Sequence, residues 1–83
     1  MSLNTLAALP LFQSAYIDTI TIRGDLRRRL LDLGFTPGSI ITPLFVSPLG
    51  DPTAYAVMGS IIALRKEDAK NIQILPLPKE ARQ

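Results

Sequence analysis

Five short β-favouring runs are the feature that most constrains how this sequence can fold. The runs are residues 15–22, 39–46, 53–57, 60–64 and 72–75, and glycine or proline stands next to most of them. A flat sheet of such strands would leave its edges exposed, and a chain of 83 residues avoids this by curling the sheet. The pattern therefore predicts a small, partly open five-stranded β-barrel.

One amphipathic helix interrupts the β pattern between the first two runs. Leu26, Leu30 and Leu33 follow the i, i+4, i+7 spacing of a helix face, and Gly34 is placed to end the helix. Asp25 is expected to cap its first turn. A barrel with this helix is either SH3-like or OB-like, and the pattern leaves both open.

The connections between the runs carry clear turn signals. Residues 36–38 read Thr-Pro-Gly and predict a type II turn, and Met58 with Gly59 predicts a tight hairpin. Pro43 predicts that its strand either lies at an edge of the sheet or contains a bulge, because proline cannot donate a hydrogen bond to a neighbouring strand. A helical turn is expected at residues 65–71, before the last run.

The apolar pattern predicts which side chains are buried. The expected core residues are Ile20, Ile22, Leu30, Leu33, Ile40, Val57, Ile61, Leu64 and Ile74. Two aromatic residues, Phe35 and Phe45, also stand where a core would include them. The aromatic residues left for the surface are Phe12, Tyr16 and Tyr55.

Composition excludes several classes of function. The sequence has no cysteine and no histidine, so it lacks thiolate ligands, the commonest general base and the commonest metal ligand. We therefore expect no enzyme.

A single domain is predicted over residues 1–78, with residues 79–83 as a frayed tail. No apolar run is long enough to insert in a membrane and no signal peptide pattern is present, so we expect a cytoplasmic location.

The carboxylates are best explained by structural roles. Besides Asp25 as a helix cap, Asp32 is four residues from Arg28 and is expected to pair with it, and Asp51 is expected to form an Asx-type turn. We expect no cofactor. A weak contact with a divalent transition metal is the most that can be assigned, and Asp51 is the weak candidate for it.

Three segments of the sequence resemble one protein family. Residues 26–38, LRRRLLDLGFTPG, are similar to the RRLxxLGFxPG signature of the FeoA family, small cytoplasmic accessory proteins of bacterial ferrous iron transport. Residues 48–52, PLGDP, resemble the family's PxGDP loop, and residues 59–72 resemble its closing Gxx(I/L)ALRxxEAxxI segment, with Asp68 at the usual Glu. Residues 11–14 depart from the family, which usually has a glycine there.

The resemblance implies an SH3-like barrel and a role beside FeoB, the membrane Fe(II) transporter with a cytoplasmic GTP-binding domain. We expect an accessory or regulatory protein that binds this transporter at the inner face of the membrane, with weak homo-oligomer formation left open. Leu49 stands between prolines, where it either contacts the partner or folds back over the barrel mouth. The candidate partner-binding residues are Arg27, Arg28, Pro48, Leu49, Gly50, Asp51, Pro52 and Tyr55.

A nucleic-acid-binding or general adaptor domain is the alternative function. The arginine run at residues 27–29 is a candidate phosphate contact, but short charge runs on a helix are most often its solvated face. No helix-turn-helix pattern precedes the barrel, so a repressor is not indicated, and we expect no nucleic acid partner.

Overall fold

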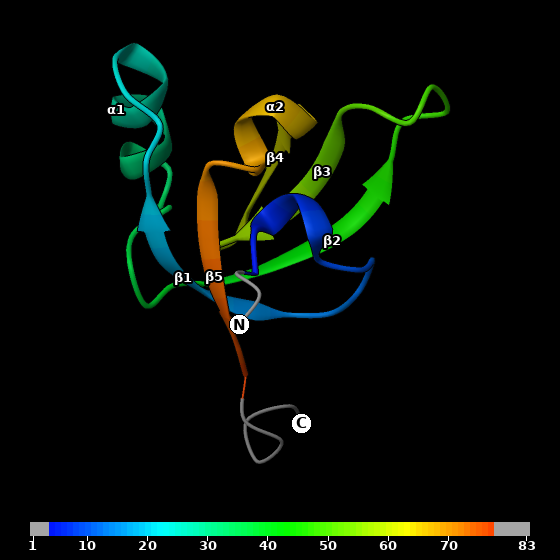
Figure 1. The fold of residues 1–83 in the computed structure, drawn as a ribbon, viewed down its shortest axis with the longest axis horizontal. Coiled ribbons are helices and arrows are strands. Elements are labelled where there is room, and N and C mark those ends of the chain that lie inside the picture. Colours follow the sequence, from blue (N-terminus) through cyan, green and yellow to red (C-terminus); the bar gives the residue numbers. More distant parts are fainter. Residues whose placement is uncertain (1–3, 78–83) are drawn as a thin grey trace.

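Residues 4–77 are described by a computed structural model of the chain (Figure 1). The predicted frayed tail, residues 79–83, lies outside the described residues. The elements in chain order are η1 (Leu6–Ala8), β1 (Ala15–Ile20), α1 (Asp25–Asp32), β2 (Ile40–Val46), β3 (Thr53–Val57), β4 (Ser60–Leu64), α2 (Lys66–Ala69) and β5 (Ile72–Pro76). Within the described range, no helix is long and apolar enough to cross a membrane.

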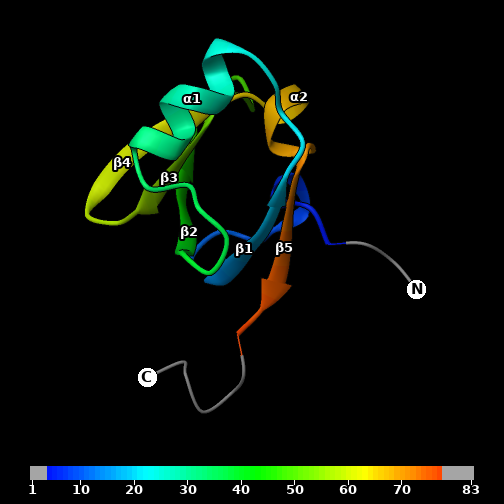
Figure 2. The ribbon, with the colours of Figure 1, turned by 90° about the vertical axis from the view of Figure 1, so that its left-hand side faces the viewer.

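The strands form one antiparallel sheet in the order β4-β3-β2-β1-β5. Figures 1 and 2 show that the sheet curls, with α1 and α2 at the same end of it. The edge strands β4 and β5 are not paired with each other within residues 4–77. The predicted partly open five-stranded barrel is therefore confirmed.

Two irregularities bend this sheet. The register of β1 against β5 shifts between Ile17 and Thr19, and the register of β2 against β3 shifts between Pro43 and Phe45. β2 is an internal strand, but its pairing with β1 covers only Ile40 and Ile41, so Pro43 pairs with β3 alone and stands next to the register shift. A bulge accommodates proline because it leaves a residue outside the regular ladder.

The end of α1 is closed as the sequence predicts. The N–H of Phe35 donates to the carbonyl of Leu30 at 2.9 Å, and the N–H of Gly34 donates to that of Leu31 at 3.1 Å. This pair of bonds is a Schellman motif, and Gly34 has the positive φ, +105°, that it requires. Phe35 and Leu30 are both buried, so the motif also fixes the helix end to the core.

The beginning of α1 differs from the prediction. Gly24 is the N-cap and Asp25 is the first helical residue, and no side-chain cap hydrogen bond is formed. The predicted cap at Asp25 is therefore wrong, because the chain enters the helix one residue earlier. At this position the carboxylate of Asp25 acts through its charge near the positive end of the helix dipole.

The predicted core is confirmed in part. Six of its members are buried, namely Ile20, Ile22, Leu30, Val57, Leu64 and Ile74, and Phe35 is buried as expected. Four predicted core residues are exposed instead, namely Leu33, Ile40, Phe45 and Ile61. Leu33 is the C-cap of α1, so it lies just beyond the last helical residue, where the apolar face of the helix ends.

Register explains the errors in the strands. Ile41 pairs with Val57 and both are buried, so its neighbour Ile40 points to the other face of the sheet. In β4 the buried residue is Leu64, which leaves Ile61 on the opposite face. The core also includes Leu6, Ala15, Ile17, Ile41, Tyr55, Ala69 and Ile72.

Both predicted tight turns are present. The N–H of Ser39 donates to the carbonyl of Thr36 at 3.0 Å, and Gly38 has φ +92°, as a type II turn requires. Met58 and Gly59 close the β3–β4 hairpin with φ values of +50° and +81°. Two positive φ values are typical of the type I′ turn, whose twist matches that of the paired strands.

We expect Gly34→Ala to be more destabilising than Gly38→Ala. Both residues have positive φ, but a Cβ at Gly34 would meet the Cγ and Cβ atoms of Met58 at 2.6 and 2.9 Å, whereas at Gly38 it would have no described atom within 4 Å. The expected losses in the free energy of unfolding are about 2–4 kcal/mol and about 1–2 kcal/mol. Urea titrations of both variants measure the difference, and equal losses would contradict the contact with Met58.

Candidate functional site

The loop of residues 47–52, between β2 and β3, carries most of the candidate residues. Figure 1 shows that this loop extends beyond the strands, on the side of the molecule away from α1. The side chain of Leu49 is 93% exposed at its tip. Leu49 therefore does not fold back over the barrel mouth, and of the two alternatives only a role outside the core remains open to it.

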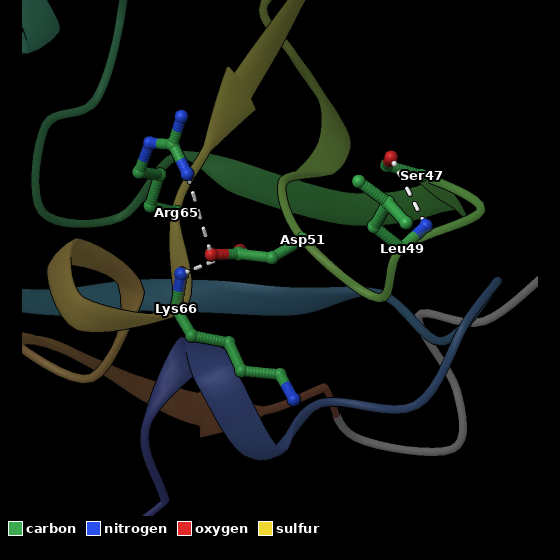
Figure 3. A network of polar contacts seen from close by, with 5 residues as sticks. All are labelled: Ser47, Leu49, Asp51, Arg65 and Lys66. Carbon is green, nitrogen blue, oxygen red and sulfur yellow. Dashed lines mark hydrogen bonds and ion pairs between the residues drawn. The ribbon is translucent and has the colours of Figure 1, made fainter.

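The backbone of this loop closes on itself. The N–H of Ser47 donates to the carbonyl of Pro52 at 2.9 Å, and the N–H of Gly50 donates to the carbonyl of Ser47 at 2.8 Å. The N–H of Leu49 also lies 3.4 Å from Oγ of Ser47 (Figure 3). These bonds, with the prolines at both ends, restrict the backbone around the exposed leucine.

Asp51 fixes the loop to the rest of the fold. Its Oδ1 accepts a hydrogen bond of 2.9 Å from the backbone N–H of Lys66, and its Oδ2 lies 3.8 Å from Nη1 of Arg65 (Figure 3). Lys66 is the first residue of α2, so Asp51 satisfies a free N–H at that helix end from another segment. The predicted Asx-type turn role of Asp51 is replaced by this long-range cap.

The two arginines lie apart from the loop, on α1. Nη1 of Arg27 donates to the carbonyl of Ile20 at 2.7 Å, so this side chain is part of the fold and is not a freely solvated charge. Arg28 is exposed. The predicted Arg28–Asp32 pair is absent, since within residues 4–77 the ion pair that forms joins Arg65 to Asp51. The candidate residues therefore occupy two separate surfaces.

Tyr55 is not available as a surface residue. Its exposed fraction is 3%, because it lies on the same face of β3 as Val57 and both point into the core. Burial raises the pKa of its phenol above the ordinary value of 10, and the nearby charge of Asp51 adds to this. The prediction that Tyr55 is an exposed aromatic is therefore wrong, and its burial argues against a direct contact with a partner, whereas Phe12 is exposed as expected.

The carboxylates do not gather into a cluster. Over residues 4–77, no group of three or more aspartates and glutamates is placed to hold a metal ion. Both carboxylate oxygens of Asp51 face cationic or N–H groups, which compete with a metal for the same lone pairs. Asp51 remains a weak candidate on this geometry.

The strand order β4-β3-β2-β1-β5, in which β1 to β4 follow one another and β5 pairs with β1, is that of the SH3-like class of small barrel and not of an OB-like one. The FeoA domain family matches residues 4–76, and the chain belongs to the FeoA family.

Three proteins illustrate this similarity. A Porphyromonas gingivalis fusion of Fe(2+) transport protein A with the Fe(2+) transporter FeoB is 40% identical over 60 residues, 72% of this chain and 7% of the fusion protein. The solution structure of FeoA from Chlorobium tepidum is 30% identical, covers 89% of this chain and 70% of its own, and has a TM-score of 0.84. Zinc-complexed FeoA from Stenotrophomonas maltophilia, described as an SH3 domain protein, is 31% identical over 84% and 87% of the chains, with a TM-score of 0.73.

We expect Asp51→Ala to lower the free energy of unfolding by about 1 kcal/mol, because it removes the acceptor for the N–H of Lys66. Asp51→Asn keeps an acceptor oxygen and should cost less. Arg65→Ala should be nearly neutral, since its pair with Asp51 is long and largely solvated. Urea unfolding of the three variants tests this order, and a loss for Arg65→Ala as large as for Asp51→Ala would contradict it.

Proposed function

We propose that this chain is an accessory domain of bacterial ferrous iron transport that binds a FeoB-type transporter on its cytoplasmic side. The observation that carries the proposal is the relative in which a FeoA segment and a FeoB transporter form one polypeptide. Because the matched segment is 7% of that fusion protein, we assign the transport activity to the remainder. The role proposed for this chain is binding and regulation.

The proposal requires a contact surface between the two parts. In a fused protein the linker keeps the parts at high effective concentration, so this surface can be weak. An exposed contact that costs little ordering on binding is sufficient.

The loop of residues 47–52 supplies such a contact. Leu49 is almost fully exposed, and the backbone that carries it is already fixed by Ser47, Pro52 and the anchor of Asp51 on α2. A preorganised apolar side chain can enter a pocket of a partner without the entropy cost of ordering a loop. We propose that Leu49 is the central contact with the transporter.

We propose a different role in binding for the exposed arginines of α1. Arg28 and Arg29 are solvent-exposed on a helix distant from the loop. Exposed charges of this kind change the rate of association and its salt dependence more than the final affinity. We propose that they steer the chain toward an acidic surface of the transporter.

We expect Leu49→Asp to abolish co-purification with the transporter and Fe(II) uptake in cells, while the thermal unfolding curve stays nearly unchanged. The reason is that Leu49 packs against little of its own fold but would carry a charge into an apolar contact. Affinity capture of the transporter measures the first effect. Leu49→Met, which keeps an apolar side chain, should retain most of the binding.

Met58→Asp is the matched control for this experiment. Met58 is 70% exposed and lies at the other end of β3, so the variant introduces the same charge at a comparably exposed apolar position. It should bind as the unmodified chain does. Loss of binding in both variants, or unchanged binding in Leu49→Asp, would contradict the role of the loop.

We also propose that the chain folds without bound metal. The apolar core of residues such as Phe35, Ile17 and Ile72 needs no ligand to close, in contrast to small domains that a metal holds together. The thermal unfolding midpoint should be the same with and without EDTA, and zinc should shift it only at high concentration. A large decrease in EDTA would contradict the proposal.

A further inference from the structure

The two edges of the sheet differ in whether another segment of the chain pairs with them. At the β5 edge, Thr5 forms a β-bridge with Gln73, and the N–H of Ile74 donates to the carbonyl of Asn4 at 2.9 Å. The chain itself therefore covers that edge. At the β4 edge, no other segment of residues 4–77 pairs with the strand, and Figure 2 shows β4 at the margin of the sheet.

The hairpin register shows which backbone groups of β4 point outward. The turn of Met58 and Gly59 has two residues, so the flanking pair of Val57 and Ser60 is the hydrogen-bonded kind and the pairs alternate from there. The backbone N–H and C=O groups of Ile62 and Leu64 then form hydrogen bonds with β3. The N–H and C=O groups of the two residues between these bonded positions, Ile61 and Ala63, point away from the sheet.

This edge lacks the features that usually prevent pairing. Natural edge strands carry a charge, a proline or a bulge that blocks an incoming strand. Within Ser60–Leu64 there is no charged residue and no proline, and the five pairs with β3 run without a register shift. The side chain of Ile61 is 66% exposed beside these free groups.

We propose that β4 pairs antiparallel with β4 of a second copy of the chain. A two-fold axis at Ile62 places Ile61 of each copy opposite Ala63 of the other. Each such pair exchanges both of its N–H···O=C bonds, so every outward group of these two residues finds a partner. The strand is thus self-complementary, which is the reason to choose a second copy over an unrelated peptide.

The charges near the strand permit this pairing. In the same register Arg65 of one copy lies opposite Gly59 of the other, so the two guanidinium groups do not face each other. Like charges directly opposite would oppose the contact. The interface is small, because the strand has five residues, and the dimer is accordingly weak and concentration-dependent.

This inference is independent of the proposed function. The two proposals use different groups: the dimer uses the outward backbone groups of Ile61 and Ala63 in β4, whereas the proposed function uses the side chain of Leu49 in the loop before β3. Leu49→Asp should therefore associate with itself as the unmodified chain does. Failure of one proposal leaves the other standing.

Sedimentation velocity of the full chain tests the dimer. Between about 10 µM and about 1 mM, the weight-average mass should rise toward twice that of one chain. Over the same range, hydrogen exchange of the amides of Ile61 and Ala63 should slow severalfold, while that of Ile62, already bonded to β3, should not change. A single-chain mass at every concentration, or concentration-independent exchange at Ile61 and Ala63, would overturn the proposal.

Substitutions at Ala63 separate the edge contact from general effects. Ala63→Pro removes an outward N–H that β3 does not use, and it should weaken the dimer at least about tenfold. Ala63→Val keeps the N–H and should associate like the parent chain. If Ala63→Pro fails to fold, Ile61→Lys places a charge at the same edge and should also prevent association. Unchanged association of a folded Ala63→Pro or Ile61→Lys variant would overturn the proposal.

Discussion

The hydrogen bonds of β1 to two strands at once are the interaction on which the rest of the structure depends. Its first residues, Ala15 and Tyr16, pair with β2, and the strand pairs with β5 along its length. The bulge after Ile17 allows this, because it turns the second half of β1 away from β2. Because the bulge adds one residue to β1, Ile17 and Ile20 both face the core, which a regular strand would not allow.

The loop of residues 47–52 depends on the β3–β4 hairpin through a polar contact. Asp51 reaches Lys66 because the register that pairs Thr53 with Leu64 continues toward these two residues, and α2 in turn buries Ala69 in the core. A single hydrogen bond contributes only about 0.5–1.5 kcal/mol. The effect of this bond is positional, because it joins an exposed loop to a helix that packs on the core through Ala69 and so limits where Leu49 can lie.

The parts of the fold that follow from neighbouring residues could be predicted from the sequence. The helix, its end at Gly34 and the Met58-Gly59 hairpin depend on residues a few positions apart, and all are confirmed. The facing of Ile40, Ile61 and Tyr55 could not be predicted. Their strands carry apolar residues on both faces, so the facing depends on pairing and bulges between distant segments.

The same distinction applies to the candidate site. The sequence predicts the loop between the prolines but leaves open whether Leu49 is exposed or folds back, and the anchor of Asp51 joins residues fifteen positions apart, which no motif of neighbouring residues marks. The hydrogen bonds of Ser47 and Gly50 hold the tip of the loop around Leu49, and the bond between Asp51 and Lys66 holds the end of the loop against α2. The conformation of the tip is thus set by neighbouring residues, whereas its place on the fold is set by a contact across the β3–β4 hairpin.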